Sequence, residues 1–485
     1  MNVVELVSAG ESLHEALGKE YYLTLSGLKQ QPAFSQIYDR FSTLLGEEAL
    51  AVARGSGTPE LLEWLVGVRI GRKVSPLEEQ QLVKERDTVL KFDGREIPFL
   101  RAAIELANSA DREFRLALDT ARSREGARAL NGIRRDRFML EHEEMRTLGY
   151  AGYVEAITSL SGIDLAALSV SAEQFLDDTK EMFSDSLAWL TRRRIGVSPD
   201  QLVRADSAWT FRADQYDTAF EPHRLIETAC QQMNEMGLDA EQAGRVRFDT
   251  EERDGKQPRA FCVPVRVPEE VYLVIRPFGG HNDYRTFWHE LGHAMHFSAP
   301  SRDLPFTDRW LGDNSVTEGF AMLWDHLTMN PVWLARYTDL SSEQVCNLVL
   351  ELAVQELHMV RRYAAKLSYE LSLHRSDFTS VGAEYAGRLS DATLFEYSED
   401  DYLMDVDPGF YSARYLRAWQ MEARLATTLV EQFGDDWFRN PGAGAFVREL
   451  TERGQALPAD RLIRQVTDHE LGFEPIVARL EGLLE

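Results

Sequence analysis

The sequence predicts a mainly α-helical protein with one small β-sheet. Apolar residues recur at spacings of three and four over most of the 485 residues, as expected for helices that bury one face. The pattern changes near residues 245–276, where short alternating runs rich in β-branched and aromatic residues predict strands. Hydrophobic residues make up 44% of the chain, which is ample for a packed interior.

Helices are expected through most of the first half of the chain. The stretch Asp119–Tyr150 is highly charged and predicts a long exposed helix or hairpin, since acids interleave its arginines. A capping-box pattern predicts a helix over Ser171–Arg194, and a proline suits the first turn of a helix over Pro222–Met236. Helical spacing also covers Leu13–Leu28, Leu61–Val66, Leu82–Leu90 and Phe99–Ala121.

Three short strands are expected to form the sheet. The strongest is Val271–Arg276 (VYLVIR), which we expect to be an edge strand that could pair with a peptide backbone. Gly279 and Gly280 follow it and either keep the strand end open to substrate or form a turn. The other two strands are expected within Arg245–Asp249 and Ala260–Pro268.

The composition argues against several classes of partner. The formal net charge is −26, and a field of this sign repels nucleic acid and anionic membranes. The sequence begins without the pattern of a signal peptide and contains no run of 18 apolar residues, so we expect no membrane span. Its three cysteines are widely spaced, which fits a reducing compartment. We therefore expect a cytoplasmic protein.

The segment His281–Phe297, HNDYRTFWHELGHAMHF, carries the main chemical signal. It has the spacing of a helix, with Asn282 or Asp283 as the expected N-cap. His289 and His293 lie four residues apart, so both imidazoles can reach one Zn²⁺ from one helix face.

Glu290 and a later carboxylate complete the expected centre. Glu290 follows the first histidine and is placed to act as general base on the zinc-bound water. Catalytic zinc needs a third protein ligand, and Glu318 follows His293 by 25 residues, in the expected first turn of a helix over Thr317–Leu327 with Thr317 or Ser315 near its cap. Asp325, seven residues further, could accept the free ring N–H of a ligand histidine.

The motif WHELGHAMHF, with Glu318 downstream, resembles the thimet oligopeptidase and oligoendopeptidase F family of zinc peptidases. In that family the pattern is FHExGHxxH, so Trp288 stands where Phe is usual. The resemblance implies His289, His293 and Glu318 as ligands of one Zn²⁺ per chain, with Glu290 as general base and acid. It also implies a large helical zincin-type body with a deep central cleft that admits oligopeptides and excludes folded proteins.

A late segment, Asp407–Ala423, is expected to complete the site. Relatives place tyrosines in a Gly/Tyr-rich segment of this kind, where they stabilise the oxyanion of the tetrahedral intermediate. Tyr411 and Tyr415 lie four apart and can face one side of a helix, and Arg414 could hold a peptide carboxylate. No histidine precedes Tyr415 within twenty residues, which departs from the pattern of those families.

The predicted function is hydrolysis of short unstructured peptides by a zinc metallopeptidase. We predict a helical N-terminal region, 1–244, that forms one wall of the cleft, and a catalytic region, 245–485, although no linker cleanly separates them. A zinc carboxypeptidase of related helical fold is the nearest alternative, with Arg414 or Arg417 as the anchor for a terminal carboxylate. A non-catalytic helical binding protein is a further alternative.

Overall fold

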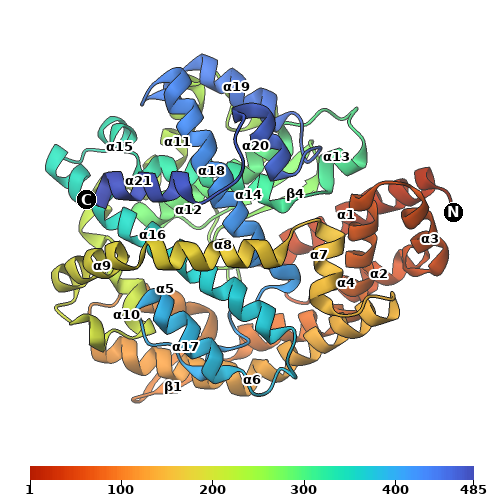
Figure 1. Ribbon diagram of the computed structural model, residues 1–485, viewed down its shortest axis with the longest axis horizontal. Helices are drawn as coiled ribbons and strands as arrows, with labels where there is room; N and C mark the ends of the chain where they lie inside the picture. Colours follow the sequence, from red (N-terminus) through yellow and green to blue (C-terminus); the bar gives the residue numbers. More distant parts are fainter. Residues whose placement is uncertain (485) are drawn as a thin grey trace.

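The computed structural model describes residues 1–484 and confirms a mainly α-helical fold, with 71% helix and 5% strand (Figure 1). Short 3₁₀ turns connect many of the helices. The helices before the central sheet are α1 Val3–Leu25, α2 Phe34–Arg40, α3 Glu47–Gly55, α4 Pro59–Asp87, α5 Ala102–Asn108, α6 Arg112–Thr147, α7 Tyr153–Ser161, α8 Leu165–Asp178, α9 Lys180–Arg194, α10 Arg204–Thr210 and α11 Leu225–Glu235. Those after it are α12 His281–Ser298, α13 Phe306–Trp310, α14 Asn314–Asp325, α15 Pro331–Tyr337, α16 Ser342–Leu373, α17 Gly382–Thr393, α18 Tyr411–Phe433, α19 Pro441–Thr451, α20 Ala459–Thr467 and α21 Glu474–Leu484.

A β-hairpin interrupts the helices expected near residue 90. Helix α4 ends at Asp87, and the strands β1 (Val89–Phe92) and β2 (Arg95–Pro98) pair antiparallel. The helix predicted over Leu82–Leu90 is therefore wrong in its last residues. The stretch Phe99–Ala121 likewise divides between α5 and α6, because Asp111 caps a new helix through the backbone N–H of Phe114.

Helix α6 is a single long helix, as its spacing predicts, but it is not an exposed one. Arg115 and Glu144 are almost completely buried. The Arg115 guanidinium lies 3.0 Å from Asp206, and Arg69 lies 2.7 Å from Glu144. Arg115 and Glu144 thus form ion pairs with neighbouring elements, and a charged pattern alone does not distinguish such buried charges from a solvated face.

The helix expected over Ser171–Arg194 is two helices. Asp164 caps α8, seven residues before the predicted cap, and the chain bends at Thr179 before α9 begins. The helix predicted over Pro222–Met236 is confirmed as a 3₁₀ turn followed by α11. Within residues 1–484, no single helix is long and apolar enough to cross a membrane, and only α7 and α8 together, bent by 94°, have the length and composition.

The expected three-stranded sheet is present, but its strand order differs from the prediction. Its strands are β3 (Val246–Asp249), β4 (Phe261–Arg266) and β5 (Glu270–Val274), in the order β3-β5-β4. β5 runs parallel to β3 and antiparallel to β4, so the strand expected at an edge is the central one. β3 and β4 are the two edge strands.

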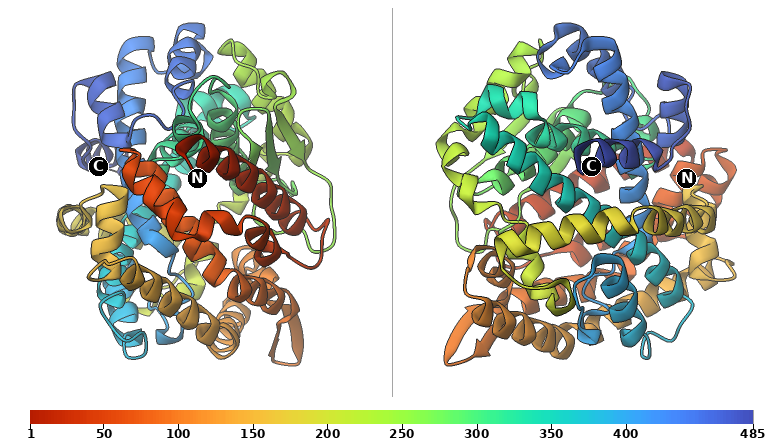
Figure 2. Two further views of the ribbon diagram at one scale, coloured as in Figure 1. Left: turned by 90° about the vertical axis from the view of Figure 1, so that its right-hand side faces the viewer. Right: turned by 60° about the vertical axis from the view of Figure 1, so that its left-hand side comes forward.

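The sheet lies between two helices. Tyr22 of α1 stacks on Tyr272 of β5, whereas Val271 packs with Ala294 of α12. Neighbouring residues of a strand point to opposite faces, so α1 and α12 cover opposite faces of the sheet. Figure 2 shows α1 in dark red beside the light green strands.

Helix α14 packs against α12 and against α18, and the three helices form the centre of the C-terminal half. The approach of α12 to α14 is close: a Cβ on Gly292 would lie 2.5 Å from Cα of Ala321. A Cβ on Gly319 would meet Sδ of Met421 in α18 at 2.7 Å. The largest hydrophobic core contains residues from both 1–244 and 245–485, and the division between these regions stays a prediction.

We predict that Gly292→Ala lowers the free energy of unfolding by about 1–3 kcal/mol, because the added methyl group overpacks the contact between α12 and α14. Gly132→Ala is the matched control: Gly132 lies on the exposed side of α6 with open space around its Cβ position. That control is expected to raise the free energy of unfolding by up to about 1 kcal/mol. Urea denaturation measures the free energy of unfolding of both variants. A change of the same sign in the two variants would contradict the close approach of α12 to α14.

Candidate metal centre

Helix α12 begins immediately after a glycine turn. Gly280 is its N-cap with φ of 89°, and a Cβ there would lie 2.5 Å from Oδ1 of Asp217. The predicted caps Asn282 and Asp283 are wrong in position, although the Asp283 carboxylate accepts hydrogen bonds from the N–H groups of Phe278 and Gly279. Of the two alternatives for Gly279 and Gly280, the structure therefore has the turn. Both glycines have positive φ, a backbone conformation that residues with a side chain rarely adopt.

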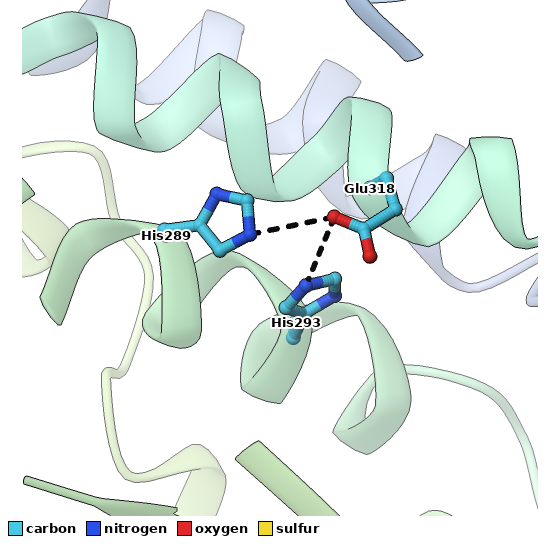
Figure 3. Close-up of side chains that lie close together, drawn as sticks. All are labelled: His289, His293 and Glu318. Carbon is cyan, nitrogen blue, oxygen red and sulfur yellow. Dashed lines mark ion pairs between the residues drawn. The ribbon is translucent and has the colours of Figure 1, made fainter. Parts of the chain in front are cut away.

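Three predicted ligands converge on one point between α12 and α14. The Nε2 atoms of His289 and His293 each lie 3.4 Å from Oε2 of Glu318 (Figure 3). This Oε2 atom is buried and has no hydrogen-bond partner among residues 1–484. Asp313 caps α14, so Glu318 is the fifth residue of the helix rather than part of its first turn.

Both imidazoles are held by their other ring nitrogen. Nδ1 of His289 lies 2.9 Å from Oδ2 of Asp325, which is the partner expected from the sequence. Nδ1 of His293 lies 2.9 Å from Oγ1 of Thr317, which sequence reasoning treated only as a helix cap. These contacts turn both Nε2 atoms toward Glu318, an arrangement that orients histidines for a metal.

The electrostatics of the three groups suit a bound cation. Burial opposes charge on Glu318, yet the two histidines outweigh it and lower the pKa of this carboxyl group. Burial lowers the pKa of His289, but Asp325 and Glu318 outweigh it and raise that pKa well above its usual value. Two imidazole nitrogens and a carboxylate that lie this close, with an orphaned oxygen among them, fit a divalent ion such as Zn²⁺.

A buried charged network lies behind Asp325. Nδ1 of His326 lies 3.0 Å from Oδ1 of Asp325, and its Nε2 lies 3.0 Å from Oε1 of Glu356. Burial lowers the pKa of His326, but Glu422, Glu356 and Asp325 raise it to about 10. Arg479 of α21 pairs with both glutamates, so this cluster is neutralised by protein cations.

Glu290 lies on the same helix as the two histidines and beside strand β4. Burial raises the pKa of its carboxyl group, whereas His289, His293 and the backbone of Cys262 lower it. Glu290 in turn raises the pKa of the Cys262 thiol, after the larger effect of burial. The carboxylate is thus placed between the candidate ligands and the edge strand.

The two tyrosines of α18 are not equivalent. The Tyr411 hydroxyl donates a hydrogen bond to Oε1 of Glu318 at 2.7 Å, so it holds the candidate ligand. Tyr415, one turn further, packs on Tyr411 with 5.2 Å between ring centroids. Burial raises the pKa of Tyr415, which keeps its phenol protonated and able to donate.

Arg414 does not offer a free guanidinium to substrate. It is 8% exposed and lies 2.6 Å from Glu63 and 3.6 Å from Asp313. Arg417 is likewise paired, at 2.9 Å from Asp313 and 3.0 Å from Asp460. Both arginines fasten α18 to neighbouring elements, which argues against the prediction that Arg414 or Arg417 anchors a peptide carboxylate.

The turn before α18 is held by a buried glutamate. Glu370 accepts hydrogen bonds from the backbone N–H of Asp407 at 3.3 Å and from the Ser412 hydroxyl. Lys366 lies 2.6 Å from Asp407 and 3.7 Å from Glu370. This turn sets the position of Tyr411 and was not visible in the sequence.

A cavity of about 870 Å³ is lined by the two tyrosines and by residues from many other elements. Its lining comes from both halves of the chain, including α5, α6, α10, α16 and α18. A volume of this size is in the range of pockets that enclose small ligands. The three candidate ligands and Glu290 are not among its lining residues, so a cleft that leads to the centre stays a prediction.

The fold is similar to those of two solved structures. One is described as "a putative oligoendopeptidase F from Bacillus anthracis str. Ames", with a TM-score of 0.64 and 15% sequence identity over 98% of this chain and 83% of that chain. The other is described as "putative Oligoendopeptidase F", with a TM-score of 0.66 and 14% identity over 98% of this chain and 84% of that chain. No protein-family model and no curated protein matches the sequence. At this identity the likeness supports the resemblance at the level of the fold alone.

We predict that Thr317→Val weakens zinc binding about tenfold or more, because His293 loses the acceptor that orients its ring. Thr393→Val is the matched control, since the Thr393 hydroxyl is also buried but bonds to the backbone of Leu389 and Phe395 rather than to a histidine. Zinc affinity measured by competition with a chelator separates the two. Equal affinities in both variants would contradict the role of Thr317.

Glu370 is expected to make stability depend on pH. Burial raises its pKa from 4.5 to about 7, so between these values the folded chain binds more protons than the unfolded chain. The resulting stabilisation is complete below pH 4.5 and is lost as the pH rises through 7, by about 3 kcal/mol. Urea denaturation of the metal-free proteins gives the free energy of unfolding of wild type and of Glu370→Gln. We expect wild type to lose stability relative to the variant as the pH rises from 4.5 to 7. A difference in free energy that does not change with pH would contradict the prediction.

Proposed function

We propose that this protein is a zinc-dependent peptidase that hydrolyses bonds in short, unstructured peptides. The observation that carries the proposal is the convergence of His289, His293 and Glu318, with Glu290 beside them. Two imidazoles and a carboxylate are a ligand set of catalytic zinc, which keeps a further position open. A zinc ion held there would act as a Lewis acid and would lower the pKa of a water molecule at the open position.

Glu290 is the proposed general base and acid. It directly follows a proposed ligand, so its carboxylate lies next to the centre without being needed to bind the metal. From this position it can take a proton from the attacking water and pass it to the departing amine. Metal binding alone does not require this residue, which favours an enzyme over a non-catalytic binding protein.

Substrate alignment and oxyanion stabilisation are assigned to β4 and α18. β4 is an edge strand whose Cys262 lies next to Glu290, so a peptide added along it would pass the centre. Tyr415 is the proposed donor to the oxyanion, because the Tyr411 hydroxyl is already committed to Glu318. The cavity lined by the two tyrosines favours short peptides as substrates, and the length of the products distinguishes an oligopeptidase from a carboxypeptidase.

The proposal is tested with a quenched fluorescent peptide library and measured zinc content. Wild type is expected to bind about one zinc per chain and to cleave peptides. Glu290→Gln should keep the zinc and lose at least about a hundredfold in kcat. Glu351→Gln is the control, because Glu351 is also buried but bonds to Gln215 and Tyr216. Peptide cleavage that survives in Glu290→Gln would contradict the mechanism.

The two tyrosine variants should differ in what they impair. Tyr415→Phe is expected to lower kcat about 10²–10³-fold without changing zinc affinity, because it removes a donor to the transition state. Tyr411→Phe is expected to weaken zinc binding, because it removes the hydrogen bond to Glu318. Steady-state kinetics and chelator competition on both variants check this assignment. The reverse pattern would exchange the two roles.

A further inference from the structure

Two arginines in the cavity lack a carboxylate partner within residues 1–484. They are Arg122 of α6 and Arg259, which lies just before β4. No acidic side chain of the described chain lies within ion-pairing distance of either guanidinium, and neither makes a hydrogen bond to the protein there. Arg122 is half-buried and Arg259 is exposed, and both line the same cavity. In a protein of net charge −26, two unpaired cations on one cavity wall are an unexpected concentration of positive charge.

The other cations of the cavity are neutralised. Arg204 lies 2.5 Å from Asp119 and 3.1 Å from Asp401. The remaining pairs are Arg134 with Glu85, Arg362 with Asp405, and Lys366 with Asp407. The carboxylates near Arg122 are thus already occupied by Arg204, which leaves three guanidinium groups facing two carboxylates.

The environment of Arg122 disfavours an unpaired charge. Burial lowers the pKa of its guanidinium to about 10. Arg204 and Arg259 lower this pKa as well, and Asp119 and Asp401 oppose the change. A desolvated cation is costly without a partner, so an anion that enters the cavity would gain a strong, charge-assisted interaction.

Arg259 lies close to the proposed centre of reaction. It precedes Cys262 by three residues, so the two Cα atoms are at most about 11 Å apart. Cys262 lies next to Glu290, and β4 is the edge strand on which a peptide would lie. A peptide that pairs antiparallel with β4 would direct its carboxyl-terminal side toward Arg259.

We propose that Arg122 and Arg259 form an anion-binding subsite of the cleft that binds a carboxylate of the peptide substrate, a few residues beyond the bond that is cleaved. The carboxylate is either the chain terminus or an acidic side chain. This inference rests on the proposed peptidase function and specifies its substrates as peptides with a carboxylate a few residues beyond the cleaved bond. It takes the place of Arg414 and Arg417, whose guanidinium groups are paired within the protein.

Peptide binding to the full-length, zinc-loaded Glu290→Gln chain tests the subsite without cleavage. The probe is an N-acetylated fluorescent hexapeptide, made with a free carboxyl terminus, with a terminal carboxamide, and as the carboxamide with one glutamate near its end. We expect the free acid to bind at least about tenfold more tightly than the carboxamide. Tight binding of the glutamate peptide would extend the subsite to acidic side chains, and weak binding would restrict it to the terminus.

The arginine variants show whether these two residues carry the preference. With Arg122→Gln and Arg259→Gln added together, we expect the Kd values of the free acid and the carboxamide to agree within about twofold. Arg124→Gln alone should leave the ratio of these Kd values unchanged. Arg124 is the matched control because it lies exposed on the same helix. Arg122→Gln is also expected not to lower the unfolding temperature, because it removes an unpaired charge rather than a structural ion pair.

Equal or undetectable binding of the acid and carboxamide forms would overturn the subsite, as would a preference that survives in the double variant. Wild-type chain is assayed in parallel for cleavage of the same peptides. Absence of cleavage contradicts the peptidase proposal, whereas the ratio of Kd values reports on the subsite alone. The two failures are therefore distinguishable.

Discussion

The close packing of α12 against α14 is the contact on which the rest of the site depends. Gly292 permits an approach that a side chain would block, with Ala321 directly opposite. One helix presents two imidazoles from a single face, and the other presents the Glu318 carboxylate, so the ligand atoms meet only if the helices nearly touch. Helix α18 packs on the other side of α14, where Tyr411 reaches Glu318. The candidate centre is therefore a product of three-helix packing rather than of one motif.

Buried charge explains much of the surrounding structure. A charge removed from water needs a partner, and this chain provides the partners as a series of contacts that leads away from the candidate centre. His289 contacts Asp325, Asp325 contacts His326, and His326 contacts Glu356, which Arg479 of the C-terminal helix neutralises. Rigid support of this kind restricts the directions in which the ligand histidines can point. Against this background of satisfied pairs, the two unpaired arginines of the cavity are the exception.

Much of the fold and the core of the site could be predicted from the sequence, because they depend on local periodicity. The spacing of His289 and His293 places both on one helix face, and alternation marks the three strands. Features that depend on tertiary contacts could not be predicted. Three examples are the strand order that makes β4 an edge, the pairing of Arg414 with Glu63, and the contact of Thr317 with His293. Each joins residues that no local sequence pattern connects. The exposure predicted for α6 is wrong at residues such as Glu144, because interior ion pairs and solvated charges look alike in sequence.

The central claim is that one metal ion is held between α12 and α14. Zinc-edge X-ray absorption of the purified full-length chain measures this most directly, because it reports the metal and its ligands together. The account predicts about one zinc per chain, with two imidazole nitrogens at about 2.0–2.1 Å and a carboxylate oxygen at about 2.0–2.2 Å, and no sulfur ligand. A chain without bound metal, or a spectrum with sulfur ligands or without imidazole, would contradict it.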